Sequence, residues 1–131
     1  MKKGIIVFLF IGVLQNYANA EDVCGKAVND GEVFSCFKSA KQTAEKTLNE
    51  EYLATKNRIA AEYSASPAAL QSYTLTLTES QRGWLKYRDG QCNLESFMAE
   101  KGTVTYDALK DKCIARVDLE RVEQLKSIPY E

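Results

Sequence analysis

Four cysteines constrain the fold of this chain more than any other feature of its sequence. They are Cys24, Cys36, Cys92 and Cys113, an even number, and all lie beyond the first twenty residues. Four cysteines allow three pairings, and closeness in the sequence favours Cys24–Cys36 and Cys92–Cys113. Each bridge would close a short loop and stabilise the fold by about 3 kcal/mol. A four-thiolate zinc site usually takes its ligands from close Cys-x-x-Cys pairs, which this sequence lacks, so we expect no bound metal.

The first twenty residues have the features of a signal peptide. Met1-Lys2-Lys3 supplies a positive start, residues 4–14 carry no charge, and Ala18-Asn19-Ala20 places small residues where a signal peptidase cleaves. The apolar run is too short for a transmembrane helix, which needs about 20 residues. Cleavage would leave Glu21 first, and because Glu21 is not a cysteine we expect no lipid anchor. We predict a periplasmic protein without a membrane anchor, and secretion outside the cell is the less favoured alternative.

The remaining chain, residues 21–131, suits one domain with a modest core. Loss of Lys2 and Lys3 takes the formal net charge from −1 to about −3. No strong basic patch stands out, so nucleic acid is not an expected partner. The oligomeric state stays open, because a helical hairpin with aromatic stripes can dimerise as easily as pack alone.

The chain contains no histidine. This absence removes the commonest general base and the commonest metal ligand, so a Ser-His-Asp or Cys-His nucleophile cannot be built. A pair of carboxylates remains possible in principle, but the acidic residues fall mainly on the polar faces of the expected helices. No glycine-rich phosphate loop is present. We therefore predict no catalytic residues, no cofactor and no enzymatic activity.

Apolar residues recur at helical spacing over three ranges, which are residues 36–64, 67–99 and 106–127. Residues 21–35 are expected to form an irregular lead-in that contains a turn, and residues 100–103 form a second turn. Short connections make neighbouring helices antiparallel. The predicted fold is all-α, with two long antiparallel helices and a shorter third helix, stapled by two disulfides.

Parts of the helical pattern are ambiguous. Thr74–Thr78 alternates like a strand, and we interpret it as helix because it has no obvious pairing partner. A capping-box pattern at Thr78 leaves open a helix that restarts there. The expected apolar face of this helix ends with Leu94 and Met98, whereas Arg58 falls among the charged residues on the back of the first helix.

The most specific motif in the chain is the run from Gln81 to Cys92. It follows the pattern Gln-x-x-Trp-x-x-Tyr-Arg-Asp-x-x-Cys and resembles a run in the LprI-like lysozyme-inhibitor family of exported bacterial proteins. Residues 44–52 are similar to that family's Ala-x-x-x-Leu-Asn-x-x-Tyr segment, and residues 113–125 to its closing run of Cys, Thr, Arg and Leu. The matching residues outside the cysteines are Leu48, Asn49, Tyr52, Gln81, Trp84, Tyr87, Arg88, Asp89, Arg121 and Leu125.

Two positions depart from the family pattern. The Thr of the closing run is Asp118 here, and the usual Gly-Gly pair between the helices is Lys101-Gly102. The second departure weakens any inference from the family about the shape or the contacts of that turn.

The resemblance implies a helical envelope protein that acts by binding another protein. Some relatives block lysozyme, and others look like immunity proteins that protect a cell from periplasmic toxins delivered by type VI secretion, including enzymes that act on peptidoglycan. We therefore expect inhibition of a cell-wall-active enzyme. The alternative is a structural or chaperone-like envelope module with a resident partner.

Most motif residues are expected to be structural. Trp84 lies on the apolar stripe of its helix and is expected in the core. Leu48, Asn49 and Tyr52 are expected to pack against the second helix, with Asn49 hydrogen-bonded across. Tyr87 fits a half-buried ring and an interface anchor equally well.

Charged motif residues are expected to pair between helices. Arg88 and Asp89 are sequence neighbours and should not face each other on a helix, so we expect Arg88 to pair with a carboxylate of the first helix and Asp89 with Arg121. If the protein binds an enzyme, the candidate contacts are Tyr87, Arg88, Glu100 and Lys101. The loop closed by the Cys24–Cys36 bridge is a further candidate.

Overall fold

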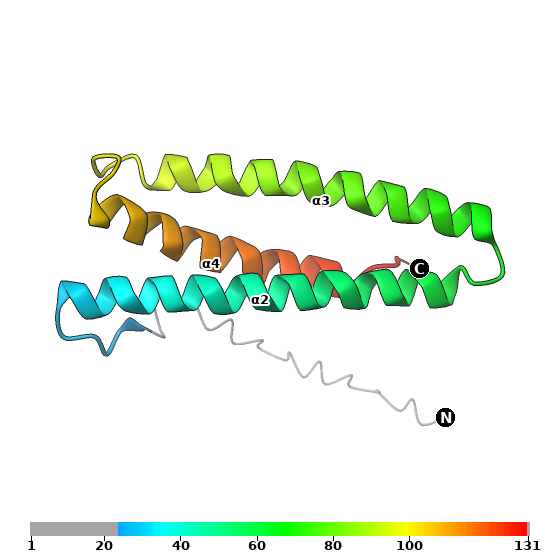
Figure 1. The fold of residues 1–131 in the computed structure, drawn as a ribbon, viewed down its shortest axis with the longest axis horizontal. Helices are drawn as coiled ribbons and strands as arrows, with labels where there is room; N and C mark the ends of the chain where they lie inside the picture. The colour runs from blue at the N-terminus through cyan, green and yellow to red at the C-terminus, as the bar shows by residue number, and fades with distance from the viewer. Residues whose placement is uncertain (1–23, 131) are drawn as a thin grey trace, which may run out of the picture.

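The computed structural model describes residues 24–130, which form three helices and no strands. They are α2 (Asp30–Glu62), α3 (Pro67–Glu95) and α4 (Val104–Lys126). Figure 1 shows α3 running antiparallel to α2. The shorter α4 lies between them and runs in the same direction as α2. The predicted all-α fold is confirmed. The expected signal peptide, residues 1–20, lies outside the described residues.

Both predicted disulfides are present. Cys24 and Cys36 are joined with their Cα atoms 5.8 Å apart, and this bridge holds the segment before α2 against the first turns of that helix. Cys92 and Cys113 are joined with their Cα atoms 5.5 Å apart, which ties the last turn of α3 to α4. The second bridge closes the α3–α4 hairpin near its turn.

The first helix begins earlier than predicted. The lead-in was expected to reach residue 35, but α2 starts at Asp30 because Asn29 caps it. The Asn29 side chain accepts a hydrogen bond from the backbone N–H of Glu32 at 3.0 Å, and the Glu32 carboxylate accepts one from the backbone N–H of Val28 at 3.0 Å. This arrangement is similar to a capping box, but Asn replaces Ser or Thr and the Glu32 carboxylate reaches the N–H of Val28, one residue before the cap. The Asn29-Asp30-Gly31 stretch is thus a helix start.

Helix α3 is continuous through the threonine-rich stretch and does not restart at Thr78. Thr76 and Thr78 donate their hydroxyl hydrogens to the carbonyls of Ser72 and Thr74, at 3.0 and 2.9 Å. These bonds to the preceding helical turn satisfy the hydroxyls within the helix. The helix ends at Glu95, four residues before the predicted end at 99, and the Ser96 hydroxyl donates to the Cys92 carbonyl at 2.6 Å.

The chain turns between α3 and α4 at residues 100–103, as predicted. Gly102 has a φ of 90°, which favours glycine because it has no Cβ. Thr103 then caps α4, accepting a hydrogen bond from the backbone N–H of Tyr106 at 3.2 Å. The helix therefore begins at Val104, two residues before the predicted start at 106.

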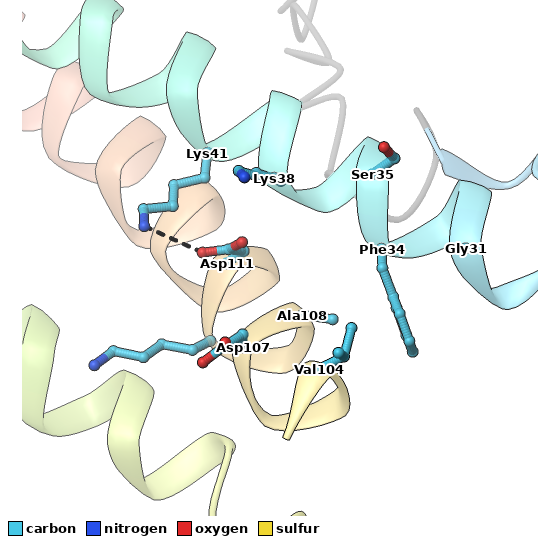
Figure 2. Close-up of a pocket in the computed structure, with 10 residues that line it drawn as sticks. Gly31, Phe34, Ser35, Lys38, Lys41, Val104, Asp107, Ala108 and Asp111 are labelled. Atoms are coloured by element: carbon cyan, nitrogen blue, oxygen red, sulfur yellow. Dashed lines mark ion pairs between the residues drawn. The ribbon is translucent and has the colours of Figure 1, made fainter. Parts of the chain in front are cut away.

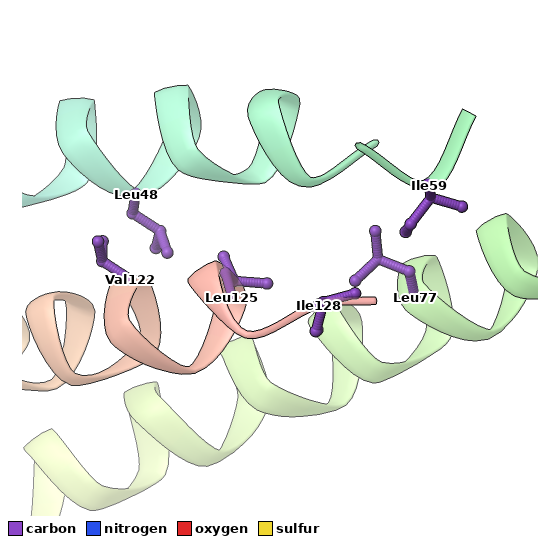
Figure 3. Packing of buried hydrophobic residues seen from close by; sticks show 6 residues of the cluster. All are labelled: Leu48, Ile59, Leu77, Val122, Leu125 and Ile128. Carbon is purple, nitrogen blue, oxygen red and sulfur yellow. The ribbon is translucent and has the colours of Figure 1, made fainter. Parts of the chain in front are cut away.

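The main core joins all three helices and the C-terminal tail. Figure 3 shows its buried side chains meeting between the elements. They are Leu48 and Ile59 of α2, Leu77 of α3, Val122 and Leu125 of α4, and Ile128 of the tail. Helix α4 contributes eight buried residues and α3 only two, Leu77 and Cys92, so α4 is the central element of the fold.

Arg58 was expected on the solvated back of its helix, but it binds the end of α4 and is only partly exposed. Its Nη2 atom donates to the Leu125 carbonyl at 2.9 Å, and its Nε atom donates to the Ile128 carbonyl at 3.0 Å. The Glu51 carboxylate holds the same guanidinium at 2.8 Å. A cation at a helix C-terminus satisfies carbonyls that lack intrahelical partners and interacts favourably with the helix dipole.

Candidate partner-binding surface

The family motif on α3 forms a packed cluster with α4. Trp84 is half-buried and packs against both the main core and the apolar cluster around the Cys92–Cys113 bridge. The guanidinium groups of Arg88 and Arg121 lie over its ring, at 5.8 and 5.6 Å from the ring centroid. At such distances the face of the indole ring attracts both cations. The structure thus places Trp84 between α3 and α4.

Arg88 joins α3 to α4. Its Nη1 atom lies 3.1 Å from Oδ1 of Asp118, a fully buried carboxylate, and its side chain is only 13% exposed. Asp89 accepts from Nε and Nη2 of Arg88 at 3.1 and 3.0 Å, so these neighbours do meet, and the expected Asp89–Arg121 pair is not formed. The long guanidinium side chain bends back to reach its neighbour. The α2 carboxylate nearest to Arg88 is Glu45, at 4.0 Å.

Burial raises the pKa of Asp118, and the neighbouring Arg88 opposes this effect by hydrogen bonding and charge. The second carboxylate oxygen of Asp118 has no hydrogen-bond partner within residues 24–130. Arg88 is therefore the cation that compensates this buried charge. Since Arg88 is engaged and largely covered, it is poorly placed to contact a partner.

Arg121 contacts neutral acceptors. Its Nε atom donates to Gln81, its Nη1 to Gln124 and its Nη2 to Ser80, at 3.0, 3.0 and 3.2 Å. Its pKa is lowered by burial, and Tyr130 weakly opposes that shift. The motif residues Gln81 and Arg121 thus meet each other, forming a second polar link between α3 and α4.

The motif residues of α2 divide between core and surface. Leu48 is buried against Val122 and Leu125, and the Tyr52 hydroxyl lies 3.5 Å from the Thr78 hydroxyl of α3. Asn49 is exposed, and within residues 24–130 it makes no hydrogen bond to another helix. The expected bond across from Asn49 is therefore absent, because its side chain points away from the helix interface.

Large apolar side chains are exposed at the α3–α4 turn. Phe97 and Met98 are 84% and 85% exposed, and Leu94 and Val104 on either side of them are 71% and 67% exposed. Leu94 and Met98 were expected on the buried face of the second helix. This prediction is wrong, because Cys92 and Ser96 occupy the buried face at the end of α3, so Leu94 faces outward, and Met98 lies beyond the helix, which ends at Glu95. We call these four side chains the apolar turn.

A groove opens beside the apolar turn, where the first turns of α2 and α4 run next to each other. Its volume is about 640 Å³. Figure 2 shows Phe34 of α2 and Val104 of α4 at one end of this α2–α4 groove, with Lys41 reaching Asp111 farther along. The Lys41–Asp111 distance is 3.1 Å. The remaining charged residues that line it are Lys38, Asp107 and Lys110.

The candidate contact residues predicted from the sequence differ in how close they lie to the apolar turn. Glu100 and Lys101 are exposed on the turn itself, adjacent to the apolar turn in sequence. Tyr87 is 59% exposed and lies on α3 well before that helix ends at Glu95. Glu100 and Lys101 are exposed in the same inter-helix connection as Phe97 and Met98, whereas Tyr87 lies within α3.

Sequence reasoning missed Phe97, Val104 and Phe34 as surface residues. The available signal was the position of Phe97 and Met98 directly before a glycine turn, where few residues can cover them. Residues 24–130 contain no group of histidine, cysteine, aspartate or glutamate arranged to hold a metal ion. In the same range, no helix combines the length and the apolar character needed to cross a membrane.

Comparison with known proteins adds one family and one fold. Residues 22–125 match the family described as lysozyme inhibitor LprI. An uncharacterized protein of Rhizobium meliloti (strain 1021) is 30% identical over 116 residues, which cover 86% of this chain and 83% of that protein. The crystal structure of a DUF1311 family protein from Pseudomonas putida KT2440 is similar with a TM-score of 0.70 and 24% identity, covering 79% of this chain and 96% of that chain. This structural likeness shows a shared fold.

Proposed function

The chain belongs to the lysozyme inhibitor LprI family, and on that premise we propose that it is a periplasmic protein that binds and blocks a cell-wall-active enzyme. The target is a lysozyme or a peptidoglycan-targeting toxin delivered by type VI secretion, against which the protein would act as an immunity protein. Two disulfides are consistent with an exported protein, since such bridges persist in oxidising compartments. Family membership supports a binding role in place of catalysis.

The apolar turn is the observation from which we infer where the target enzyme binds. Exposed apolar side chains are ordinary when scattered, but here four of them fall within eleven residues at one inter-helix connection: Leu94, Phe97, Met98 and Val104. Phenylalanine and methionine are enriched at the centres of protein interfaces. Their exposure is not needed for the fold, because the core lies between the helices.

The charges near the apolar turn suit a glycosidase cleft. Such clefts place a pair of carboxylates beside the scissile bond. Lys101 projects from the turn and could meet such a carboxylate, while Glu100 could contact basic residues around the cleft. A net charge of about −3 after removal of the first twenty residues would speed the approach to a cationic lysozyme only slightly.

The proposal is tested by mixing the purified protein with lysozymes and with peptidoglycan-degrading toxins and measuring hydrolysis. We expect one target to be inhibited stoichiometrically at micromolar concentration. Inhibition of a secreted toxin and not of lysozymes would identify an immunity protein, and the reverse would identify a lysozyme inhibitor. Absence of binding to all of these enzymes would reject the proposal.

Substitution at the apolar turn tests where the target binds. Phe97→Ala/Met98→Ala removes two exposed side chains, and we expect at least tenfold weaker inhibition, because central aromatic anchors commonly contribute about 2 kcal/mol to binding. The control is Leu53→Ala/Leu75→Ala, which removes two exposed leucine side chains, 55% and 57% exposed, from α2 and α3 away from the apolar turn. Equal loss from both variants would place the contact elsewhere.

A further inference from the structure

A second groove lies away from the apolar turn, between the first half of α3 and the C-terminal tail. It has a volume of about 480 Å³, within the usual range for small-molecule sites. The rings of Tyr63, Tyr73 and Tyr130 line it, and Leu77 and Ile128 contribute buried apolar surface. We call it the tyrosine groove.

The tyrosine groove contains one cation and no acidic lining residue within residues 24–130. The cation is Arg121, and no carboxylate of the described residues lies within ion-pair distance of it. This differs from Arg58, Arg88 and Arg116, each of which pairs with at least one carboxylate. Arg121 is thus a partly buried guanidinium that, among the described residues, lacks a counter-charge.

The hydrogen bonds of Arg121 leave part of its capacity unused. A guanidinium offers five N–H groups. Three are donated to the neutral oxygens of Gln81, Gln124 and Ser80, which leaves one N–H on each terminal nitrogen. Two N–H groups on the terminal nitrogens of arginine suit a carboxylate, which accepts such bonds more strongly than a neutral oxygen does.

The walls of the groove define the rest of the ligand. Tyr63 and Tyr73 lie with their ring centroids 5.2 Å apart in a tilted arrangement, and Tyr130 is 67% exposed beside them. Rings of this kind contact aromatic or aliphatic groups over a large area. The groove therefore combines an apolar wall with a single uncompensated positive charge.

We propose that the tyrosine groove binds a ligand that has a carboxylate attached to an aromatic or aliphatic body, with the carboxylate paired to Arg121. Two sources have this chemistry, a free carboxylic acid and the C-terminal residue of a peptide. The site is separate from the apolar turn, so it stands whether or not an enzyme is bound there.

The test uses calorimetric titration of the purified protein with N-acetyl-phenylalanine and with its neutral amide. We expect the acid to bind at least tenfold more tightly than the amide, because a hydrogen-bonded charge pair is replaced by a neutral contact. A tetrapeptide that ends in phenylalanine, compared with its C-terminal amide, distinguishes the two sources: tighter binding of the peptide favours a peptide end, and tighter binding of the free acid favours a small molecule. Equal binding of acid and amide, or no binding of any acid at millimolar concentration, would overturn the proposal.

Variants separate the charge from the apolar wall. Arg121→Gln is expected to remove the preference for the acid, whereas Arg116→Gln, at an arginine paired with Glu95 and Glu120, is expected to retain it. Tyr130→Ala, at an exposed residue, is expected to weaken acid and amide alike. If Arg121→Gln fails to fold, nuclear magnetic resonance of the unmodified protein decides: the acid should shift the ring signals of Tyr73 and Tyr130 and leave those of Tyr87 unchanged, and the opposite pattern would refute the site.

Discussion

Arg88 and Asp118 form an ion pair whose loss is expected to lower the free energy of unfolding strongly. Asp118 is fully buried, and one of its oxygens has no partner within residues 24–130, so its charge depends on Arg88. Arg88→Ala is therefore expected to lower the free energy of unfolding by about 3–5 kcal/mol, the usual cost of leaving a buried charge uncompensated. Urea denaturation followed by helical circular dichroism measures it.

The control is Arg116→Ala, which breaks ion pairs with the more exposed Glu95 and Glu120. Such surface pairs contribute about 0–1 kcal/mol, so the loss should be small. The double variant Arg88→Ala/Asp118→Thr should recover part of the stability lost in Arg88→Ala, because it removes the uncompensated charge. Similar losses for the two arginine variants would show that the Asp118 carboxylate is not the cause.

The pKa of Asp118 makes stability depend on pH. Burial raises this pKa above the ordinary value of 3.8, and the nearby carboxylates of Glu45 and Asp89 add to the shift. At pH values between the unfolded and the folded pKa of Asp118, the native state binds more protons than the unfolded state. The contribution of Asp118 protonation to the free energy of unfolding is therefore fully present below pH 3.8 and is lost as the pH rises through the raised pKa. Asp118→Thr, which restores the residue of the family pattern, should lack this loss. Unfolding free energies of both proteins across the pH range test it, and parallel curves would contradict it.

At the scale of elements, periodicity predicted that three helices exist but did not place all of their ends. The start of α2 was missed because Asn29-Asp30-Gly31 is also typical of a turn, and only the Glu32 backbone bond to Asn29 decides between them. Arg58 was assigned to solvent because helical spacing alone cannot show that α4 ends beside it. Such facts depend on tertiary packing, which a one-dimensional pattern does not contain.

The glycines differ in what their elements require. Gly102 has a φ of 90°, whereas Gly90 lies inside α3, where a Cβ would meet no other atom within 4 Å. Gly102→Ala should therefore destabilise the protein by about 1 kcal/mol, since a side chain strains this conformation. Gly90→Ala should stabilise it by about 0.5–1 kcal/mol, because alanine is the better helix former. Thermal denaturation measures whether each variant is more or less stable than the original protein. A stabilising Gly102→Ala would show that the turn tolerates another conformation.

At the scale of the whole molecule, the candidate contact surface was only partly predictable. The exposure of Glu100 and Lys101 could be predicted, because a turn between helices is exposed in almost any packing. The exposure of Phe97 and Leu94 was not predicted, because an apolar residue is normally expected inside, and which face of a helix is covered depends on tertiary packing. The tyrosine groove unites residues from α3, α4, the end of α2 and the tail, so no local motif could have indicated it.

The disulfides are expected to stabilise different parts of the molecule. Helix α3 buries only Leu77 and Cys92, so its second half depends on the Cys92–Cys113 bridge more than α2 depends on either bridge. Cys92→Ala/Cys113→Ala should cost about 3 kcal/mol and should speed hydrogen exchange in residues 81–95 well before exchange rises in α2. Cys24→Ala/Cys36→Ala should lower stability without this local effect, because its loop precedes and enters α2. Uniform acceleration across all helices in both variants would mean that the three helices unfold as one unit, and that α3 is held by packing along its length.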